Sequence, residues 1–406
     1  MPSSTGSPAP APDGLPAPAR RRAIATLVLG LAASVLDATM VPLALPGIAR
    51  DLQSGASQAV WVVNAWQVAV LALLLPLATW GDRTSHRRIY LAGLALFIAA
   101  SAACMAADSL AVLVAARAVQ GAGAAGVMAV NTALVRLVYP QRLLGRGIAL
   151  NAVVVSAASV AGPALAAAIL SVATWRWLFA VNLAIGVGVV LLGRGALPAN
   201  GTRPAGAAAP LLPIDLLRIP VFRLSMGASI GAFAAQAMAF VALPFLLLDA
   251  FGRSPREAGL ALAAWPLGAV ATAPVAGRLV GRHPDGLLGG VGLAAVGIGL
   301  LLLAALPAHA STADVLWRMA LCGAGFGLFQ APNNHAIVTS APAHRAGAAG
   351  GMLGTARLTG QTLGAFGVAL WLEAGVPAGD APAAPLALGA AAAFVACALS
   401  LGRLRA

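Results

Sequence analysis

The sequence predicts an all-α membrane protein with about twelve transmembrane helices. Of its 406 residues, 60% are hydrophobic and only 9% are charged, whereas about 25% of the residues in a soluble globular domain are charged. A soluble fold of this composition would lack the polar residues that its surface needs. The chain instead contains twelve apolar runs, each close to the roughly 20 residues that cross the hydrocarbon core of a bilayer.

The apolar runs fall into two sets of six. They lie near 24–46, 58–80, 88–107, 110–134, 146–170, 177–197, 222–248, 257–280, 287–307, 313–338, 345–371 and 382–402. Only Asp108 and Ser109 separate the third run from the fourth, so this is the boundary at which the number of helices is least secure.

Between the two sets, the segment 198–220 is polar and rich in Pro and Gly. We therefore expect a disordered cytoplasmic N-terminus over residues 1–22, a six-helix bundle over 23–197, a cytoplasmic linker over 198–221 and a second six-helix bundle over 222–406. Two six-helix halves around a midplane site are the architecture of many secondary transporters.

The distribution of arginine predicts the orientation in the membrane. All 25 basic residues are arginine, and the formal net charge is +13. Alternate connections and both chain ends carry 18 arginines, the other connections carry five, and Arg117 and Arg357 lie within runs. An arginine excess marks the cytoplasmic side, so we expect both termini in the cytoplasm of a bacterial inner membrane. Because the arginines form short clusters between apolar runs, no nucleic-acid partner is expected.

Several classes of function lack the motifs that they need. A nucleotide-binding P-loop requires a lysine, and the chain has none. The three cysteines lie in apolar runs with no metal-ligand spacing, so no metal and no cofactor are expected. His309, His335 and His344, with scattered acidic residues, do not suggest an enzyme, and no repeated filter sequence suggests a channel.

Asp37 and Arg117 are charged residues inside predicted spans. Such charges are costly and mark proton or substrate pathways. Because burial disfavours an ionised carboxylate, Asp37 could gain and lose a proton in the working range. Arg117 needs a partner, and Asp37 is the candidate. We expect the pair to couple protonation to conformation; a purely structural buried pair is the alternative.

Two further motifs lie at the ends or bends of predicted helices. A short connection after the second run contains Gly81, Asp82, Arg83, Arg87 and Arg88, which we interpret as a cytoplasmic gate that breaks when the halves move; simple topology determination explains its arginines equally well. In the fifth run, Gly162 and Pro163 permit a kink. This kink either serves transport or is tolerated without a function.

Other polar and aromatic residues in or beside the spans are candidates for a substrate cavity. Taken individually, each of these residues more often forms a hydrogen bond between helices than a contact with substrate. The candidates are Asn64, Trp66, Gln67, Gln120, Gln236, Phe240, Gln330, Asn333, Asn334, Arg357 and Gln361.

Taken together, these motifs resemble the major facilitator superfamily, and within it the drug:proton antiporters, over roughly residues 23–403. The stretches 36–39 and 44–46 resemble the first-helix signature of that branch, and 81–88 resembles the loop-two signature of the superfamily. Arg117, Gln120, Gly121 and Gly123 resemble the fourth-helix motif, and Gly162 and Pro163 the antiporter motif. Residues 175–179 with Asn182 resemble the start of the sixth helix.

The resemblance implies two pseudosymmetric bundles that rock to alternate access, with export driven by proton entry. The resemblance implies that Asp37 handles protons or cationic drugs and that Arg117 takes part in proton coupling. It implies that the Gly162-Pro163 pair affects the direction of transport and the packing of the bundles. The branch often has fourteen spans, whereas this chain has twelve runs. His86 stands where a basic residue is usual, and Pro42 where asparagine is frequent.

The function predicted from the sequence is proton-coupled efflux of hydrophobic or cationic small molecules. Its alternatives are export of an endogenous metabolite, or a non-transporting membrane sensor or assembly protein. The partners expected are a small-molecule substrate, protons and the lipid bilayer, with the proton gradient as the energy source and the chain as a monomer.

Overall fold

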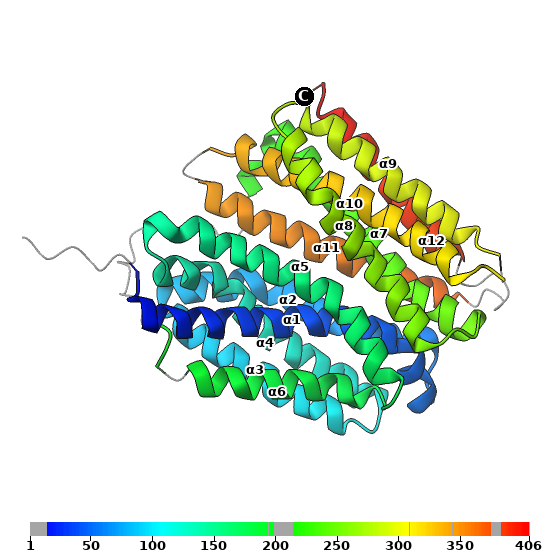
Figure 1. Ribbon diagram of the computed structural model, residues 1–406, viewed down its shortest axis with the longest axis horizontal. Helices are drawn as coiled ribbons and strands as arrows, with labels where there is room; N and C mark the ends of the chain where they lie inside the picture. The colour runs from blue at the N-terminus through cyan, green and yellow to red at the C-terminus, as the bar shows by residue number, and fades with distance from the viewer. Residues whose placement is uncertain are drawn as a thin grey trace, which may run out of the picture.

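The computed structural model describes residues 14–193, 195–198, 214–307, 309–342, 345–374 and 383–405. Within these residues the chain forms twelve long α-helices joined by short connections (Figure 1). They are α1 (Ala17–Asp51), α2 (Ala56–Arg83), α3 (His86–Ala106), α4 (Leu110–Val138), α5 (Leu144–Leu170), α6 (Arg176–Gly193), α7 (Pro220–Pro244), α8 (Pro255–Leu279), α9 (Asp285–Ala304), α10 (Thr312–Ser340), α11 (Ala346–Glu373) and α12 (Ala383–Gly402). Short 3₁₀ helices η1 (Gln141–Leu143) and η2 (Ile214–Arg218) precede α5 and α7, and a π-helix η3 (Phe245–Ala250) extends α7.

Each predicted apolar run coincides with one helix. The doubtful boundary between the third and fourth runs is real, because α3 ends at Ala106 and Ser109 caps α4 by accepting a hydrogen bond from the N–H of Val112. In the described part of the chain, nine helices are long and apolar enough to cross a membrane. The other three are α6, which is apolar over 176–191, and α10 and α11, which carry most of the candidate cavity residues of the second half.

The chain start differs from the prediction of disorder over residues 1–22. Residues 1–13 lie outside the described residues, but α1 already begins at Ala17 and therefore includes Arg20, Arg21 and Arg22. Pro18 in the first turn favours this start, since it has no N–H to leave unpaired. The N–H of Leu15 donates to the carbonyl of Val138 at 3.0 Å, which ties the segment to α4. Of the predicted linker, residues 199–213 also lie outside the described residues.

The two halves, α1–α6 and α7–α12, lie side by side (Figure 1), and their helices pack in the same plan. In the first half α1 packs on α5 and α6, α4 packs on α2 and α3, and α3 packs on α6. In the second half α7 packs on α11 and α12, α10 packs on α8 and α9, and α9 packs on α12. Adding six to each helix number converts one set into the other. The halves meet mainly through α5 with α8 and α2 with α11, two contacts that the same operation exchanges.

Equivalent helix pairs in the two halves approach at their backbones. Gly93 of α3 lies against Gly123 and Gly126 of α4, and Gly292 of α9 lies against Gly325 of α10. A Cβ at any of these positions would overlap the facing main chain. Small residues at such crossings allow dispersion contacts between backbones, which is a main source of helix association in lipid.

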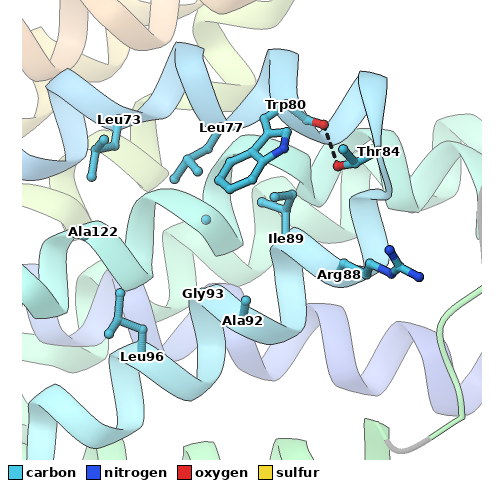
Figure 2. Close-up of a pocket in the computed structure, with 11 residues that line it drawn as sticks. Leu73, Leu77, Trp80, Thr84, Arg88, Ile89, Ala92, Gly93, Leu96 and Ala122 are labelled. Carbon is cyan, nitrogen blue, oxygen red and sulfur yellow. Dashed lines mark hydrogen bonds between the residues drawn. The ribbon is translucent and has the colours of Figure 1, made fainter.

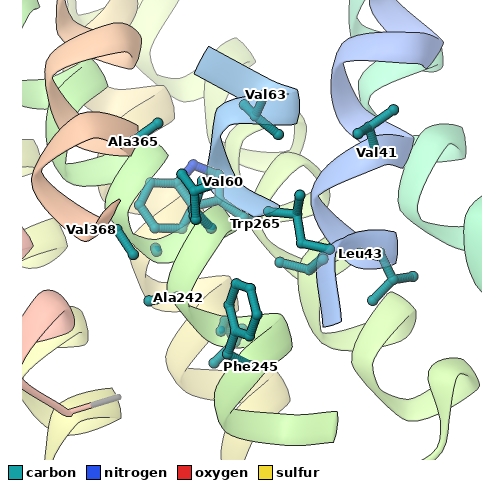
Figure 3. Packing of buried hydrophobic residues seen from close by; sticks show 14 of the residues in the cluster. Val41, Leu43, Val60, Val63, Ala242, Phe245, Trp265, Ala365 and Val368 are labelled. Carbon is teal, nitrogen blue, oxygen red and sulfur yellow. The ribbon is translucent and has the colours of Figure 1, made fainter. Parts of the chain in front are cut away.

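The two ends of the molecule differ in how the halves meet. We call the end with both described chain ends and the α2–α3, α4–α5, α8–α9 and α10–α11 connections the arginine-rich end. At the other end, one buried apolar cluster draws on both halves (Figure 3). We call this cluster the opposite-end seal; it includes Val41, Leu43, Val60, Val63, Ala242, Phe245, Trp265, Ala365 and Val368.

At the arginine-rich end each half instead has its own cluster. One contains Leu27, Ile89 and Leu134 from the first half, and the other contains Phe222, Ile337 and Met352 from the second half. These two clusters are separate from each other. Leu358 of α11 nevertheless packs with Trp66 and Val70 of α2, so apolar contacts between the halves continue beyond the opposite-end seal.

Candidate functional site

The predicted pairing of Asp37 with Arg117 is confirmed by the structure. Arg117 Nη1 donates to Asp37 Oδ2 at 2.5 Å, and both side chains are about 1% exposed. The pair joins the middle of α1 to α4. Since both charges are removed from water, each needs the other and further hydrogen bonds to be tolerated there.

Neutral donors complete the shell of the Asp37 carboxylate. Its Oδ1 accepts from Gln120 Nε2 at 3.2 Å and from Asn182 Nδ2 at 2.6 Å. Gln120 also accepts from Arg117 and donates to Ser101 Oγ at 2.8 Å. The carboxylate thus holds α1, α4 and α6 together through one group, and Gln120 extends the network to α3.

Arg117 is held on its remaining sides by the backbone and by two rings. Its Nε donates to the carbonyl of Val62 at 3.0 Å. The guanidinium carbon lies 5.7 Å from the ring centroids of both Trp66 and Phe179. Cation–π attraction is strongest where water is excluded. The two rings therefore help to hold the Arg117 guanidinium in this pocket independently of the charge on Asp37.

The role of Asn182 could not be assigned from the sequence. The sequence marks Asn182 only as part of a sixth-helix motif, because no pattern in it shows which residue of α6 reaches the depth of Asp37. The same motif also anchors the start of α6. Trp175 Nε1 donates to Asp51 at 3.0 Å, and Arg176 Nη2 donates to the carbonyl of Ala107 at 3.0 Å.

Gly162 and Pro163 lie where α5 touches two other helices. A Cβ at Gly162 would overlap Thr39 Oγ1 of α1. One residue on, the carbonyl of Pro163 would lie 2.7 Å from a Cβ at Gly259, the close approach of α8 from the other half. The motif therefore links the neighbourhood of Asp37 to a contact between the halves.

The predicted gate residues lie at the α2–α3 connection. Gly81 is buried, and a Cβ there would meet Val130 of α4 at 2.7 Å. Asp82 is exposed and lies 2.9 Å from His86 Nε2, one turn on. Arg83 and Arg88 are exposed and Arg87 is half-buried. In the described part of the chain, no hydrogen bond or ion pair joins these residues to the second half.

A cavity of about 460 Å³ adjoins this connection. Figure 2 shows Leu73, Leu77 and Trp80 of α2 facing Ile89 and Leu96 of α3, with Ala122 of α4 behind them and Arg88 at one end. Trp80 and Leu96 are 57% and 40% exposed, so the cavity opens on the outer surface of the first half. Apart from Arg88, none of the predicted site residues lines it.

Several predicted cavity residues lie on α2 and α11, two helices that pack against each other. The two helices run antiparallel: Trp61 packs edge-on against Phe366, with ring centroids 6.0 Å apart, and Leu74 lies beside Gly354. On α2, Asn64, Trp66 and Gln67 lie between these two contacts, and on α11 so do Arg357 and Gln361. Buried atoms without a hydrogen-bond partner in the described residues include both amide atoms of Asn64, Trp66 Nε1, Gln67 Oε1 and Arg357 Nε.

Other predicted cavity residues take part in separate contacts. Gln120 belongs to the Asp37 network, and Phe240 packs edge-on against Trp265. Asn333 donates to Ser229 at 2.7 Å and accepts from Arg403 at 3.0 Å, so its amide is used within the second half. Gln236, Gln330 and Asn334 are half-buried.

A second buried arginine network was missed. Arg403, at the end of α12, donates to Ser225 Oγ and Asn333 Oδ1, both at 3.0 Å, and to Ser400 Oγ at 2.5 Å. Among the described residues, no group of three or more His, Cys, Asp or Glu side chains is placed to hold a metal ion.

Comparisons with known proteins agree with this architecture. The chain is 44% identical over 415 residues to "Uncharacterized transporter YebQ" of Escherichia coli (strain K12), covering 89% of this chain and 91% of that protein. It is 30% identical over 406 residues to "Multidrug resistance protein Stp" of Mycobacterium tuberculosis (strain ATCC 25618 / H37Rv), covering 85% and 75%. In fold it is similar to a bacterial homolog of the human lysosomal transporter Spinster, with a TM-score of 0.74 at 19% identity, over 96% of this chain and 98% of that one.

Residues 27–365 match the family described as Major Facilitator Superfamily. This match covers most of the chain and agrees with the twelve helices, their repeated packing plan and the contacts between the halves. The chain is therefore a multi-pass membrane transporter that belongs to the major facilitator superfamily.

Proposed function

We propose that this transporter exports hydrophobic small molecules from the cytoplasm in exchange for protons, and that Asp37 carries the proton. The observation that carries the proposal is the fully buried Asp37 carboxylate, bound by Arg117, Gln120 and Asn182. The arginine-rich end faces the cytoplasm in this proposal, because arginine accumulates on that side of bacterial membranes.

Protonation changes the forces that hold α1 to α4. Two unit charges about 4 Å apart attract by about 4 kcal/mol at an effective dielectric constant of about 20. A proton on Asp37 removes this attraction and leaves the amide donors of Gln120 and Asn182 facing a neutral acid. Arg117 keeps its bond to Val62 and its two aromatic faces, so it stays in the pocket while α1 is released.

Release of α1 reaches the contacts between the halves through α5. Thr39 lies two residues after Asp37 on α1 and packs on Gly162, and the neighbouring Pro163 meets α8. A shift of α1 would therefore change the α5–α8 contact, and rocking about the α5–α8 and α2–α11 contacts would open one end as the other closes.

The test is substrate-dependent proton release in inverted membrane vesicles, which present the cytoplasmic face outward. Addition of a lipophilic dye should release protons from wild-type vesicles, and Asp37→Asn should abolish this release. Asp108→Asn is the matched control, because Asp108 is an exposed acid in the α3–α4 connection. Equal proton release by wild type and Asp37→Asn would refute the role of Asp37.

A further inference from the structure

Arg357 is a charged side chain in the middle of α11 whose charge has no partner. In the described part of the chain it makes no hydrogen bond and no ion pair, and its Nε is buried without a partner. The two buried arginines of the described residues have partners: Arg117 has Asp37, and Arg403 has several hydroxyl and carbonyl acceptors. An unpaired guanidinium inside a membrane span is costly, so it needs a partner during the transport cycle.

The position of Arg357 on its helix directs it to the interior. Arg357 shares one helix face with Gly350, Gly354 and Gln361, which are spaced three or four residues apart along α11. The opposite face carries Leu363, Phe366 and Leu370, which are 53%, 39% and 51% exposed and so form the outer surface. On the interior side, Gly364 of α11 packs on Ala234 of α7 and Gly354 is nearest to Leu74 of α2. Arg357 lies between these two contacts.

The interior face of α11 borders open space. Nothing lies within 4 Å of a Cβ built at Gly350, and at Gly354 only the tip of Leu74 does, at 3.8 Å. The Arg357 side chain is half-buried, so part of it reaches this space. The space lies on the arginine-rich side of Leu358, which packs with Trp66 and Val70 of α2.

Neutral polar atoms without partners lie on the same stretch of α2 and α11, between the Trp61–Phe366 and Leu74–Gly354 contacts. Asn64 is 1% exposed, and neither of its amide atoms has a hydrogen-bond partner in the described residues. Gln67 Oε1 on α2 and Thr362 Oγ1 on α11 are likewise buried without one. Buried polar atoms are normally hydrogen-bonded, so these groups and Arg357 form a set of donors and acceptors to which a ligand would bind.

The charge of the interior selects the ligand class. The Asp37 charge is neutralised by Arg117 and its oxygens are occupied by three donors, so Asp37 offers little to a cation in this state. Arg357 remains as an uncompensated positive charge. We propose that the transported molecule is an amphiphile with a carboxylate, which binds Arg357 between α2 and α11 with Asn64 and Gln67 as neutral partners. This inference rests on the proposed export function and narrows its substrate class.

The experiment measures uptake into energised inverted vesicles of two matched probes, a fluorescent lipophilic carboxylate and its neutral N-methylamide, and of a lipophilic cation as a third probe. In the wild type, uptake of the carboxylate should exceed that of the amide. Arg357→Gln should lower the carboxylate-to-amide ratio by about 10- to 100-fold, the range for a lost hydrogen bond to a charged group. Arg357→Lys, which keeps the charge, should retain most of the preference. Arg318→Gln is the matched control, because Arg318 pairs with Asp314 at the opposite end and should leave the ratio unchanged.

The outcomes separate this inference from the export function. Uptake of the amide and of a lipophilic cation by the wild type, without preference for the carboxylate, would overturn the carboxylate inference while export stands. Transport of none of the three probes would count against the export function itself. An unchanged ratio in Arg357→Gln would also overturn the inference. If that variant does not accumulate in the membrane, the wild-type preference and the Arg357→Lys ratio still decide.

Discussion

Gly162 of α5 lies directly against Thr39 of α1, two residues after Asp37. The hydroxyl of Thr39 is turned back onto its own helix, where it bonds the carbonyl of Val35 at 2.9 Å. Asp37 and Thr39 are two residues apart on one helix, so the proposed proton site and the contact with α5 lie on opposite sides of α1.

A methyl group at residue 162 should therefore impair transport. Gly162→Ala should lower export several-fold, because overpacking at a tight contact costs about 1–3 kcal/mol and here would push α1 away from α5. Gly145→Ala is the matched control in the same helix, since nothing lies within 4 Å of a Cβ there. Dye efflux, normalised to the amount of protein in the membrane, measures both. Equal impairment of the two variants would indicate a general helix effect instead.

Breaking the Asp37–Arg117 pair from one side should destabilise the protein more than breaking it from both. Asp37→Ala leaves a buried unpaired guanidinium, which costs about 3–5 kcal/mol. The double variant Asp37→Ala with Arg117→Met should recover part of this loss. Thermal unfolding in detergent measures the two against wild type. A double variant less stable than Asp37→Ala alone would show that Arg117 is held chiefly by Val62 and the aromatic rings.

Asn182→Ala should lower export without abolishing it. Asn182 donates to the Asp37 carboxylate at 2.6 Å, and a hydrogen bond to a charged group contributes about 1.5–3 kcal/mol. Removing it should lower dye-dependent proton release by about 10- to 100-fold, while the bonds from Arg117 and Gln120 keep the carboxylate in place. Asn131→Ala is the control, because the buried Asn131 Oδ1 has no hydrogen-bond partner among the described residues. Proton release equal to that of wild type would contradict the role of Asn182.

Arg403 should stabilise the arginine-rich end of the second half. Its guanidinium joins α12 to α7 and α10 through Ser225 and Asn333. Arg403→Gln should lower the free energy of unfolding by about 2–3 kcal/mol, since charge-assisted bonds are the stronger class. Arg405→Gln, two residues on and exposed, should change it little. Thermal unfolding of the purified variants gives the comparison.

The proposed orientation is open to a direct labelling test. In a background without Cys104, Cys322 and Cys397, a single cysteine at Asp108 should react with an impermeant maleimide in intact cells. A cysteine at Thr84 should react only in inverted vesicles. Both sites are exposed and lie at opposite ends of the helices. The reverse pattern would invert the topology.

Much of the fold could be predicted because the bilayer leaves the backbone few choices. A run of about 20 apolar residues must satisfy its hydrogen bonds internally and so forms a helix. The prediction for residues 17–22 was wrong: their composition suggests disorder, but α1 already begins at Ala17. The hydrogen bond from Leu15 to Val138 precedes this start, and composition cannot reveal it because its acceptor lies on a helix far along the chain.

The sequence predicts contacts in the candidate site only for charged side chains, because a charge inside a span needs a partner. Asp37 and Arg117 could be paired because an isolated charge is not stable in a span. Asn182 is neutral and its depth relative to Asp37 is a property of tertiary packing. Arg403 resembled a topology signal, since an arginine just beyond a span usually is one, and only the structure shows it buried among hydroxyl groups.

The glycine contacts of α3 with α4 and of α9 with α10 have a mechanical consequence. Where main chains touch without side chains between them, the paired helices cannot adjust to each other by changes of side-chain rotamer. Each half therefore moves as a rigid body. A displacement of a few tenths of an ångström near Asp37 would then be amplified along the length of the half instead of being absorbed within it. The largest movements would appear at the connections between helices, far from the carboxylate that starts them.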